Sequence, residues 1–517
     1  MPSFHFTALA LALLAVVEAH PFEQLQFQVP LLHDQPGPDT SQPGFNVLHH
    51  LSGISPFFDS HGPPPAAPEG CVVIAAAILA RHSSITMNDD EWPETMGPFV
   101  EKLDSYDTSN IPDDSALSFL KQWATPITES NMEELTGPGA TDAEAFGRRM
   151  KMLYEDLLPG HNDPAFKIFT ASSARDVDSS KAFIRGMFPK RVIGHKPGQV
   201  SLLKVPNKAP KWASSLTPHK SCDRFDKKVG KKERDAFQEQ YATPIAQRFA
   251  TALPGWTWNW TDVVAMQQLC GYETVIRSSS PFCAIFSQQD MENFEYSQDL
   301  YYFYMLGSHN RWAAALGIPW LQIAVDKLNQ TASQPLGSHP VPTPTLLPTP
   351  SSDLYEEEEK DEATSKLPKP SQGPNATLSQ PLHVWFTHRE EVPLVTHALD
   401  LFHGHDEESA EMPLDRINPS RAWRTSEIIP FLGHVALERM QCDERVTATT
   451  TKSPRDRRPR TKPFVRIIVN GSPQMQPMCH DGPGGSCPLE EFADIVRDLP
   501  NTYGDLETIC LVDKGGK

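Results

Sequence analysis

Residues 71–90 read CVVIAAAILARHSSITMNDD, and this stretch predicts the fold most directly. Its apolar run from Val72 to Ala80 ends abruptly in the polar pair Arg81-His82. A short apolar run bounded by turn signals is typical of a strand buried on both faces, as in a parallel sheet. Because open α/β sheets bind ligands beyond the carboxyl ends of such strands, we expect Arg81 and His82 at the rim of an active site.

Two further segments repeat this layout of strand, polar residues and helix. Residues 382–386, LHVWF, form a β-rich run, which is followed by the polar residues THRE at 387–390 and by an amphipathic helix over 395–402. Earlier in the chain, a short strand over 166–169 precedes a loop that ends in Arg175, and a helix follows. Strands that alternate with helices in this way predict an α/β fold.

The pair Arg81-His82 after a buried strand resembles the start of the RHGxRxP motif of the histidine acid phosphatases, a family that includes the fungal phytases. Ser83 stands where the motif has Gly, and Ile85 stands where it has its second Arg. The loop that ends in Arg175, with the helix that closes as FIRGMF at 183–188, is similar to the family's second phosphate-binding stretch.

The resemblance extends, with interruptions, from about Glu69 to Cys510, and residues 261–286 and 307–317 match the phytase pattern closely. It implies a phosphoglycerate-mutase-like fold, which is a three-layer α/β/α sandwich with a mostly helical cap domain. It also implies a phosphoric monoester hydrolase that acts at acid pH on small-molecule phosphomonoesters, phytate among them. Such an enzyme needs no cofactor and no metal.

The resemblance also implies a role for each motif residue. His82 is the expected nucleophile, which carries a phosphohistidine intermediate. The expected phosphate ligands are Arg81, Arg175 and His388. The family usually has His-Asp in the second catalytic segment, with the Asp as proton donor, whereas this chain has His-Arg-Glu. One branch, the multiple inositol polyphosphate phosphatases, carries His-Ala-Glu, so Glu390 is the expected proton donor and Glu391 the alternative.

Phosphate chemistry explains why these residue types are needed. Cations must offset the anionic phosphate oxygens before a neutral imidazole nitrogen can approach, and the Arg fork binds such oxygens in pairs. Ile85 removes one ligand, and losing a charge-assisted hydrogen bond of about 1.5–3 kcal/mol slows a reaction roughly 10- to 150-fold. Arg389, or the hydroxyls of Ser83 and Ser84, are candidate substitutes. The alternative function is a catalytically impaired or inactive secreted glycoprotein that keeps the fold as a phosphate-binding module.

Composition and the resemblance together divide the chain into six segments. They are a signal peptide at 1–19, an extended N-terminal arm at 20–64, the first part of an α/β catalytic domain with some cap helices at 65–190, a mostly helical cap domain at 191–330, a Pro-rich and acidic disordered insertion at 331–380, and the second part of the catalytic domain at 381–517. The insertion lacks the apolar residues that a packed core requires.

The apolar core at 8–17 and the small residue at position 19 predict a secretory signal peptide, hence a secreted, extracellular protein. Eight cysteines in a secreted chain favour disulfides, although their number alone leaves 105 pairings open. The family resemblance implies the pairs Cys71–Cys442, Cys222–Cys510, Cys270–Cys283 and Cys479–Cys487. Candidate N-glycosylation sites are Asn259, Asn329, Asn375 and Asn470.

The net charge of −19 argues against a nucleic-acid partner, because nucleic-acid phosphates need Lys and Arg. After residue 19 no apolar run approaches the length of a membrane span, so we expect no membrane partner. A zinc hydrolase built on His403 and His405 is a third possibility, but the chain has no HExxH or comparable ligand set. No pattern indicates an oligomeric state.

Overall fold

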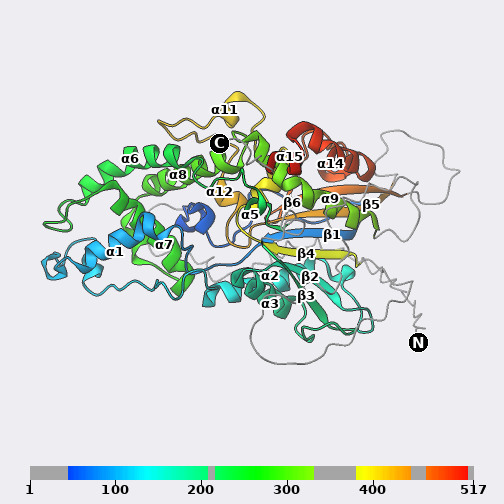
Figure 1. Cartoon of the computed structure of the whole chain (residues 1–517), viewed down its shortest axis with the longest axis horizontal. Helices are drawn as coiled ribbons and strands as arrows, with labels where there is room; N and C mark the ends of the chain where they lie inside the picture. The colour runs from blue at the N-terminus through cyan, green and yellow to red at the C-terminus, as the bar shows by residue number, and fades with distance from the viewer. Residues whose placement is uncertain (1–44, 64, 208–215, 331–379, 444–460, 511–517) are drawn as a thin grey trace, which may run out of the picture.

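The computed structural model describes residues 45–63, 65–207, 216–330, 380–443 and 461–510. The predicted signal peptide, nearly all of the predicted insertion and the sequon at Asn375 lie outside these residues. A sheet with its covering helices forms one end of the described part, and a group of helices forms the other end (Figure 1).

An eight-stranded mixed sheet organises the first of these parts. Its strands run in the order β3 (Val200–Val205), β2 (Phe166–Ala171), β4 (Leu382–Thr387), β1 (Cys71–Arg81), β5 (His434–Asp443), β6 (Thr461–Val469) and β7 (Ser472–Gln474), and β8 (Cys487–Pro488) pairs with β6. The first four strands are parallel, and the remaining pairs are antiparallel. The strand predicted at 72–80 is confirmed as the central strand β1, fully buried from Ala75 onward.

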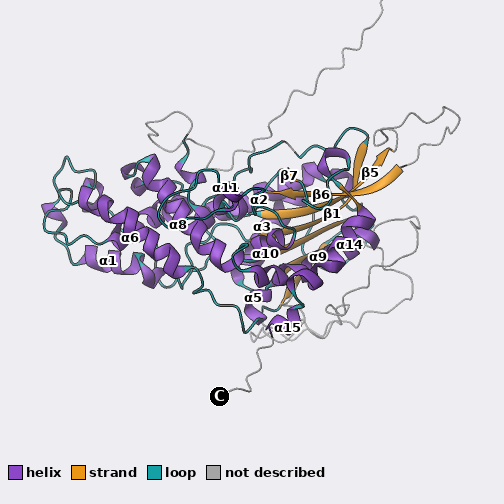
Figure 2. Cartoon of the chain, turned by 90° about the horizontal axis from the view of Figure 1, so that it is seen from above, coloured by secondary structure: helices purple, strands orange, loops and turns teal. Residues whose placement is uncertain are grey.

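Helices cover both faces of the sheet, so the sheet part has three layers (Figures 1 and 2). One face carries α2 (Gly137–Leu153) and α3 (Ala174–Met187), and the other carries α9 (Ala314–Gln330), α10 (Glu391–Ala398) and α14 (Leu489–Tyr503). The backbones of α2 and α3 approach so closely that a Cβ on Gly186 would lie 1.9 Å from the carbonyl oxygen of Glu144. The predicted three-layer α/β/α fold is confirmed.

The helices at the other end form the predicted cap. Its main members are α1 (Met96–Asp104), α6 (Lys231–Arg248), α7 (Trp260–Arg277) and α8 (Gln288–Leu306), and they share one apolar core (Figure 1). The shorter helices of the described chain are α5 (Pro218–Ser221), α11 (Glu407–Ala410), α12 (Thr425–Ile428) and α15 (Leu506–Cys510). The expected cap range of 191–330 was too wide. β3 lies in the sheet and α9 packs on it, because the apolar side chains of α9 complete the core of that face.

Residues 45–63, part of the predicted extended arm, are packed against the cap helices. Val47, Leu48, Leu51 and Ile54 are buried and belong to the same apolar core as the cap helices. Two short 3₁₀ turns, Val47–His49 and Ser52–Ile54, present these side chains. Each turn is only three residues long, too short to leave a periodic pattern in the sequence.

Two helix starts also differ from expectation. Asn88 with Glu91 three residues on is a capping-box pattern, but α1 begins only at Met96, after a 3₁₀ turn over Trp92–Glu94, because the Glu91 carboxylate bonds to Arg389. The helix predicted over 395–402 begins at Glu391, where Pro393 fits the first helical turn.

All four expected disulfides form, and no cysteine is free. Cys71 and Cys442 are directly opposed on β1 and β5. Among the described sequons Asn259 is exposed, but the prediction at Asn470 is wrong for the folded protein. Asn470 is fully buried and its amide donates to the carbonyls of Glu427 and Ile428, which leaves no room for a glycan. In the described chain, no helix combines the length and apolarity needed to cross a membrane.

Candidate active site

The loops that follow β1, β2 and β4 meet at one edge of the sheet. The register of the parallel strands sets Arg81 opposite Thr387, so the two segments that follow begin side by side. The backbone N–H of His82 donates to the carbonyl of Thr387 over 2.9 Å. The rings of His82 and His388 lie edge to face, with centroids 6.4 Å apart. The structure therefore brings together the two histidines that the sequence separates by about three hundred residues.

The imidazole of His82 is held in one tautomer. Its Nδ1 lies 2.8 Å from the carbonyl oxygen of Ser83, which can only accept, so Nδ1 carries the proton and Nε2 keeps its lone pair. Burial, together with the charge of neighbouring Arg81, holds the pKa of His82 well below its ordinary value. A lowered pKa favours the neutral ring, which is the state of a nucleophile.

Arg81 is fully buried and fixed by the backbone. One guanidinium nitrogen, Nη1, donates to the carbonyls of Gly53 and Ile429, both over 2.6 Å. The guanidinium also lies 4.2 Å from the centre of the Phe431 ring. Burial and the charge of Arg389 lower the pKa of Arg81 to about 9, so this side chain remains a cation at neutral and acid pH.

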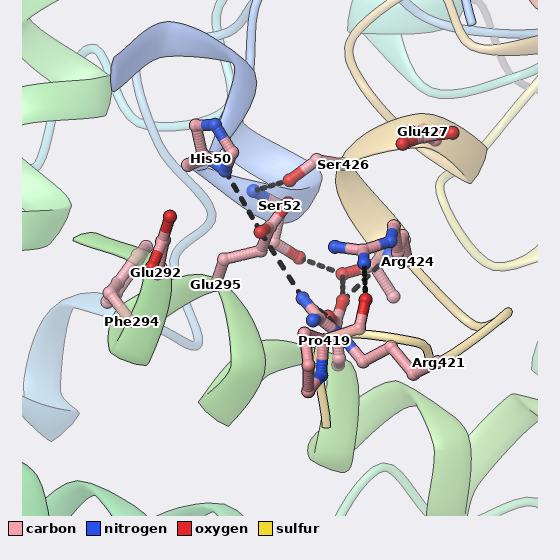
Figure 3. A network of polar contacts seen from close by, with 12 residues as sticks. His50, Ser52, Glu292, Phe294, Glu295, Pro419, Arg421, Arg424, Ser426 and Glu427 are labelled. Carbon is pink, nitrogen blue, oxygen red and sulfur yellow. Dashed lines mark hydrogen bonds and ion pairs between the residues drawn. The ribbon is translucent and has the colours of Figure 1, made fainter. Parts of the chain in front are cut away.

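A polar network anchors the segment that supplies Gly53 (Figure 3). The N–H of Ser52 donates to Ser426 Oγ over 2.8 Å, and His50 Nδ1 lies 3.0 Å from a carboxylate oxygen of Glu295 (Figure 3). Arg421 extends the network, with its Nη2 3.3 Å from the same carboxylate oxygen, Glu295 Oε2. The N-terminal segment is therefore tied to α8 and α12, and it positions Arg81 through a backbone carbonyl.

The start of α3 supplies two charged groups. Arg175 Nη1 lies 2.7 Å from Glu133 Oε2, and Asp176 Oδ2 lies 2.9 Å from His388 Nε2. Burial alone would raise the pKa of Asp176, but the charges of His388, His82 and Arg175 lower it to about 2. Sequence reasoning found Arg175 and missed Asp176, although its place next to Arg175 in the first helical turn was a usable signal.

Glu390 and Glu391 lie at the two different ring nitrogens of His219. Glu390 Oε2 lies 3.8 Å from His219 Nε2, and its Oε1 lies 3.5 Å from Lys227 Nζ. Glu391 accepts a hydrogen bond from His219 Nδ1. Although burial raises the pKa of Glu390, the charges of Lys227, His219 and Arg389 hold it well below its usual range.

The cap provides a second cation near these carboxylates. Lys220 lies at the rim, where partial burial and the charge of Arg175 lower its pKa. The negative charges of Asp176, Glu390 and Glu391 raise the pKa of Lys220. Residues 204–232 are rich in Lys and Arg, but the sequence alone does not show which of these side chains face the site. His219, Lys220 and Lys227 are the functional candidates that sequence reasoning missed.

The substitutes considered for the missing arginine have different partners. Arg389 pairs with Glu91 at 2.6 Å, and Ser83 Oγ donates to the carbonyl of Gly139 over 2.7 Å. Ser84 Oγ is buried and has no hydrogen-bond partner among the described residues. Ile85 is fully buried in the apolar core. Of the two serine hydroxyls, the structure therefore leaves that of Ser84 uncommitted.

Two clusters of potential metal ligands occur in the described ranges. One is His219, His388 and Glu390, and the other is Cys479, Cys487 and Glu491. The second cannot bind a metal through sulfur because its cysteines form a disulfide. His403 bonds to Asp400 instead of joining a cluster with His405, so the zinc hydrolase considered from the sequence has no ligand set in the described part.

Comparisons with known proteins find relatives over most of the chain. The sequence model of the histidine phosphatase superfamily (branch 2) matches residues 77–470. An acid phosphatase of Komagataella pastoris is 24% identical over 505 residues, which cover 95% of this chain and 93% of that protein. Phytase A of Arthroderma benhamiae is 24% identical over 447 residues, which cover 85% of this chain and 87% of that protein.

Solved structures show the same fold. The phytase from D. castellii has a TM-score of 0.69 at 20% identity, covering 91% of this chain and 90% of its own. A multiple inositol polyphosphate phosphatase of Bifidobacterium longum, in complex with inositol hexasulfate, has a TM-score of 0.56 at 12% identity, covering 90% of this chain and 100% of its own.

Proposed function

The chain belongs to branch 2 of the histidine phosphatase superfamily, and from this premise we propose that it is a secreted acid phosphatase that hydrolyses phosphomonoesters through a phosphohistidine. One observation carries the proposal. A neutral imidazole, that of His82, is next to the cation Arg81 and faces His388 at the carboxyl edge of a parallel sheet. The acid phosphatases and phytases among the relatives support the same reaction class.

In the first step, His82 Nε2 attacks the phosphorus atom in line with the ester bond. The N–P bond forms as the P–O bond to the alcohol breaks. Arg81, Arg175 and His388 bind the phosphate oxygens, and their charges stabilise the transferring group. The hydrogen bond from His82 Nδ1 to the carbonyl of Ser83 supports this role, because it orients the ring and leaves Nε2 free. The Glu133 carboxylate and the phosphate compete for the guanidinium of Arg175, so Glu133 releases Arg175 when phosphate binds.

Glu390 protonates the departing alkoxide and then serves as base for the second step. A bound phosphate ester adds negative charge beside Glu390 and offsets Lys227 and Arg389, which raises the low pKa of the carboxyl group. In the second step the Glu390 carboxylate takes a proton from water, the oxygen attacks phosphorus, and the N–P bond breaks. Glu391 is the weaker candidate, because its Oε1 is engaged by His219 Nδ1.

Four disulfides support secretion. Disulfides persist in oxidising compartments and are rare in the cytosol. The exposed sequon at Asn259 is available for glycosylation in such a compartment. The substrate is a small-molecule phosphomonoester, and phytate is the first polyphosphate to test.

The test is phosphate release from an aryl phosphate and from phytate at acid pH. His82→Ala is expected to lose activity on both substrates while keeping its circular dichroism and melting temperature. His161→Ala is the matched control, because this histidine is exposed and lies outside the site. Turnover by His82→Ala equal to that of the wild type would refute the proposal.

A binding module without turnover is the second candidate, favoured by Ile85 at the position of the missing arginine. In that case the wild-type protein would bind phosphate or tungstate in calorimetry and release no phosphate above the His82→Ala control. Ser84 Oγ, buried without a partner among the described residues, is the group that could replace part of the lost binding.

A further inference from the structure

We propose that His219, His388 and Glu390 form a binding site for a divalent transition-metal ion, with Zn²⁺ as the best fit, and that the bound ion inhibits the enzyme. The three residues are buried, and one ligand atom from each lies within 4.8 Å of the others. Two imidazoles and one carboxylate are a ligand set that Zn²⁺ prefers. The expected enzyme needs no metal, so the site is an addition to the catalytic chemistry.

His219 gives the strongest evidence for the site. Its side chain is only 3% exposed, and its Nδ1 donates to Glu391, so in the neutral ring the lone pair is on Nε2. That nitrogen is buried and has no hydrogen-bond partner among the described residues. An imidazole whose far nitrogen is held by a carboxylate is the arrangement seen around metal-ligating histidines, where the carboxylate fixes the tautomer and raises the basicity.

The spacing of the ligands suits a small cation. His219 Nε2 lies 3.8 Å from Glu390 Oε2, too far for a hydrogen bond. Ligands about 2.0–2.1 Å from a tetrahedral Zn²⁺ lie roughly 3.4 Å apart, so the pair needs to close by only a few tenths of an ångström. The ring centroid of His388 lies 5.9 Å from that of His219, and its Nε2 also lies 2.9 Å from Asp176 Oδ2. Three protein ligands leave the fourth position for water or a phosphate oxygen.

Lys227 opposes the metal and gives the proposal a second test. Its Nζ lies 3.5 Å from Glu390 Oε1, on the oxygen that does not face His219. A fixed ammonium at that distance repels a divalent cation. The side chain is 44% exposed and also reaches Asp90 at 3.4 Å, so it can move aside. Lys227→Met is therefore expected to tighten metal binding several-fold.

The inhibitory consequence rests on the proposed function. A metal bound to His388 takes away a phosphate ligand, and a metal bound to Glu390 takes away the proton donor. Metal binding itself does not depend on catalysis, so the two claims can fail separately. Absence of phosphate release by the metal-free protein would refute the proposed function and leave the binding claim standing.

The experiment uses the full-length secreted protein after removal of metals with a chelator. Co²⁺ is titrated in at pH 7 without phosphate, and the visible absorption of the bound ion is recorded. Zn²⁺ is then titrated by calorimetry. We expect one equivalent with an intense absorption of the four-coordinate type, and loss of phosphatase activity that the chelator reverses. Scattered weak sites, or no saturable binding at one equivalent, would overturn the proposal.

Two variants test the role of His219 in the site, and a third variant is the control. His219→Ala is expected to abolish binding, and Glu391→Gln, which changes only the group that orients His219, is expected to weaken it about 10- to 100-fold. His403→Ala is the control and should bind like the wild type, because this residue is outside the cluster. Wild-type affinity in Glu391→Gln or His219→Ala would contradict the assignment. If His219→Ala does not fold, Glu391→Gln and Lys227→Met still decide.

Discussion

The position of the loop that carries His82 depends on Gly139, so Gly139→Ala is a sharp test of the site. Gly139 lies in the first turn of α2, where its N–H donates to Thr136 Oγ1 and its carbonyl accepts from Ser83 Oγ over 2.7 Å. A Cβ on Gly139 would lie 2.3 Å from the carbonyl oxygen of Ser84 and 2.9 Å from Thr136 Oγ1. The alanine therefore pushes the backbone directly after His82.

The size of the effect follows from these distances. Carbon and oxygen atoms need about 3.2 Å, so the carbonyl of Ser84 must retreat by roughly 1 Å, and a displacement of that size can cost about 100-fold in rate. Overpacking also costs about 1–3 kcal/mol of stability. We expect kcat/KM for an aryl phosphate to fall about 100-fold in Gly139→Ala, with a protein that remains folded.

Gly137→Ala is the matched control for this prediction. Gly137 lies in the same helical turn, but a Cβ there would have nothing within 4 Å. We expect it to keep both activity and melting temperature. The reasoning would be refuted if Gly139→Ala kept kcat/KM within about threefold of the wild type, or if Gly137→Ala lost as much.

Three further predictions concern charges at the site. Glu390→Gln should lower kcat about 10²- to 10⁴-fold on alkyl phosphates and far less on an aryl phosphate with a good leaving group, because Glu390 is buried and water cannot replace it as the acid. If Glu391→Gln showed this difference between the substrates instead, the assignment of the proton donor would be reversed. The pKa of Asp176 is about 2 in the folded protein, against 3.8 for an unperturbed Asp side chain. Its charge therefore stabilises the folded state by about 2 kcal/mol above pH 4, and this contribution is lost as the pH falls through 2. Urea unfolding of Asp176→Asn should show that deficit at pH 5 and almost none at pH 2, and an equal deficit at both pH values would contradict it. Glu133→Gln should lower the inhibition constant of inorganic phosphate about two- to fivefold, since it frees the buried Arg175 from an ion pair with a carboxylate that is 40% exposed, and an unchanged constant would show that the pair does not compete.

The parts of the fold that could be predicted are those that a short stretch of sequence specifies by itself. β1, β2 and β4 are apolar runs with polar residues directly behind them, and the register of parallel strands then brings His82 and His388 together. The disulfides followed from the family resemblance, because the cysteine count leaves the pairing open. Helix starts were less predictable, since Glu91 fits a capping pattern but uses its carboxylate for Arg389.

The parts that were missed depend on contacts between distant segments. No local pattern places His219 against Glu390, because the short helix α5 sits in a basic stretch without periodicity. The same holds for the carbonyl of Gly53, which fixes Arg81 from a segment that the sequence predicts as an extended arm. In both cases the burial of a charged or polar group decides the contact, and burial is a property of the assembled core.

The most direct test of the central claim is to trap the covalent intermediate. The wild-type protein is mixed with an aryl phosphate at acid pH, quenched within milliseconds in alkali, which preserves phosphohistidine, and digested for mass spectrometry. We predict a phosphoryl group on the peptide that contains His82, formed as fast as the first alcohol is released and absent in His82→Ala. Steady turnover with no phosphoryl group on His82, or with one on another residue, would contradict the account.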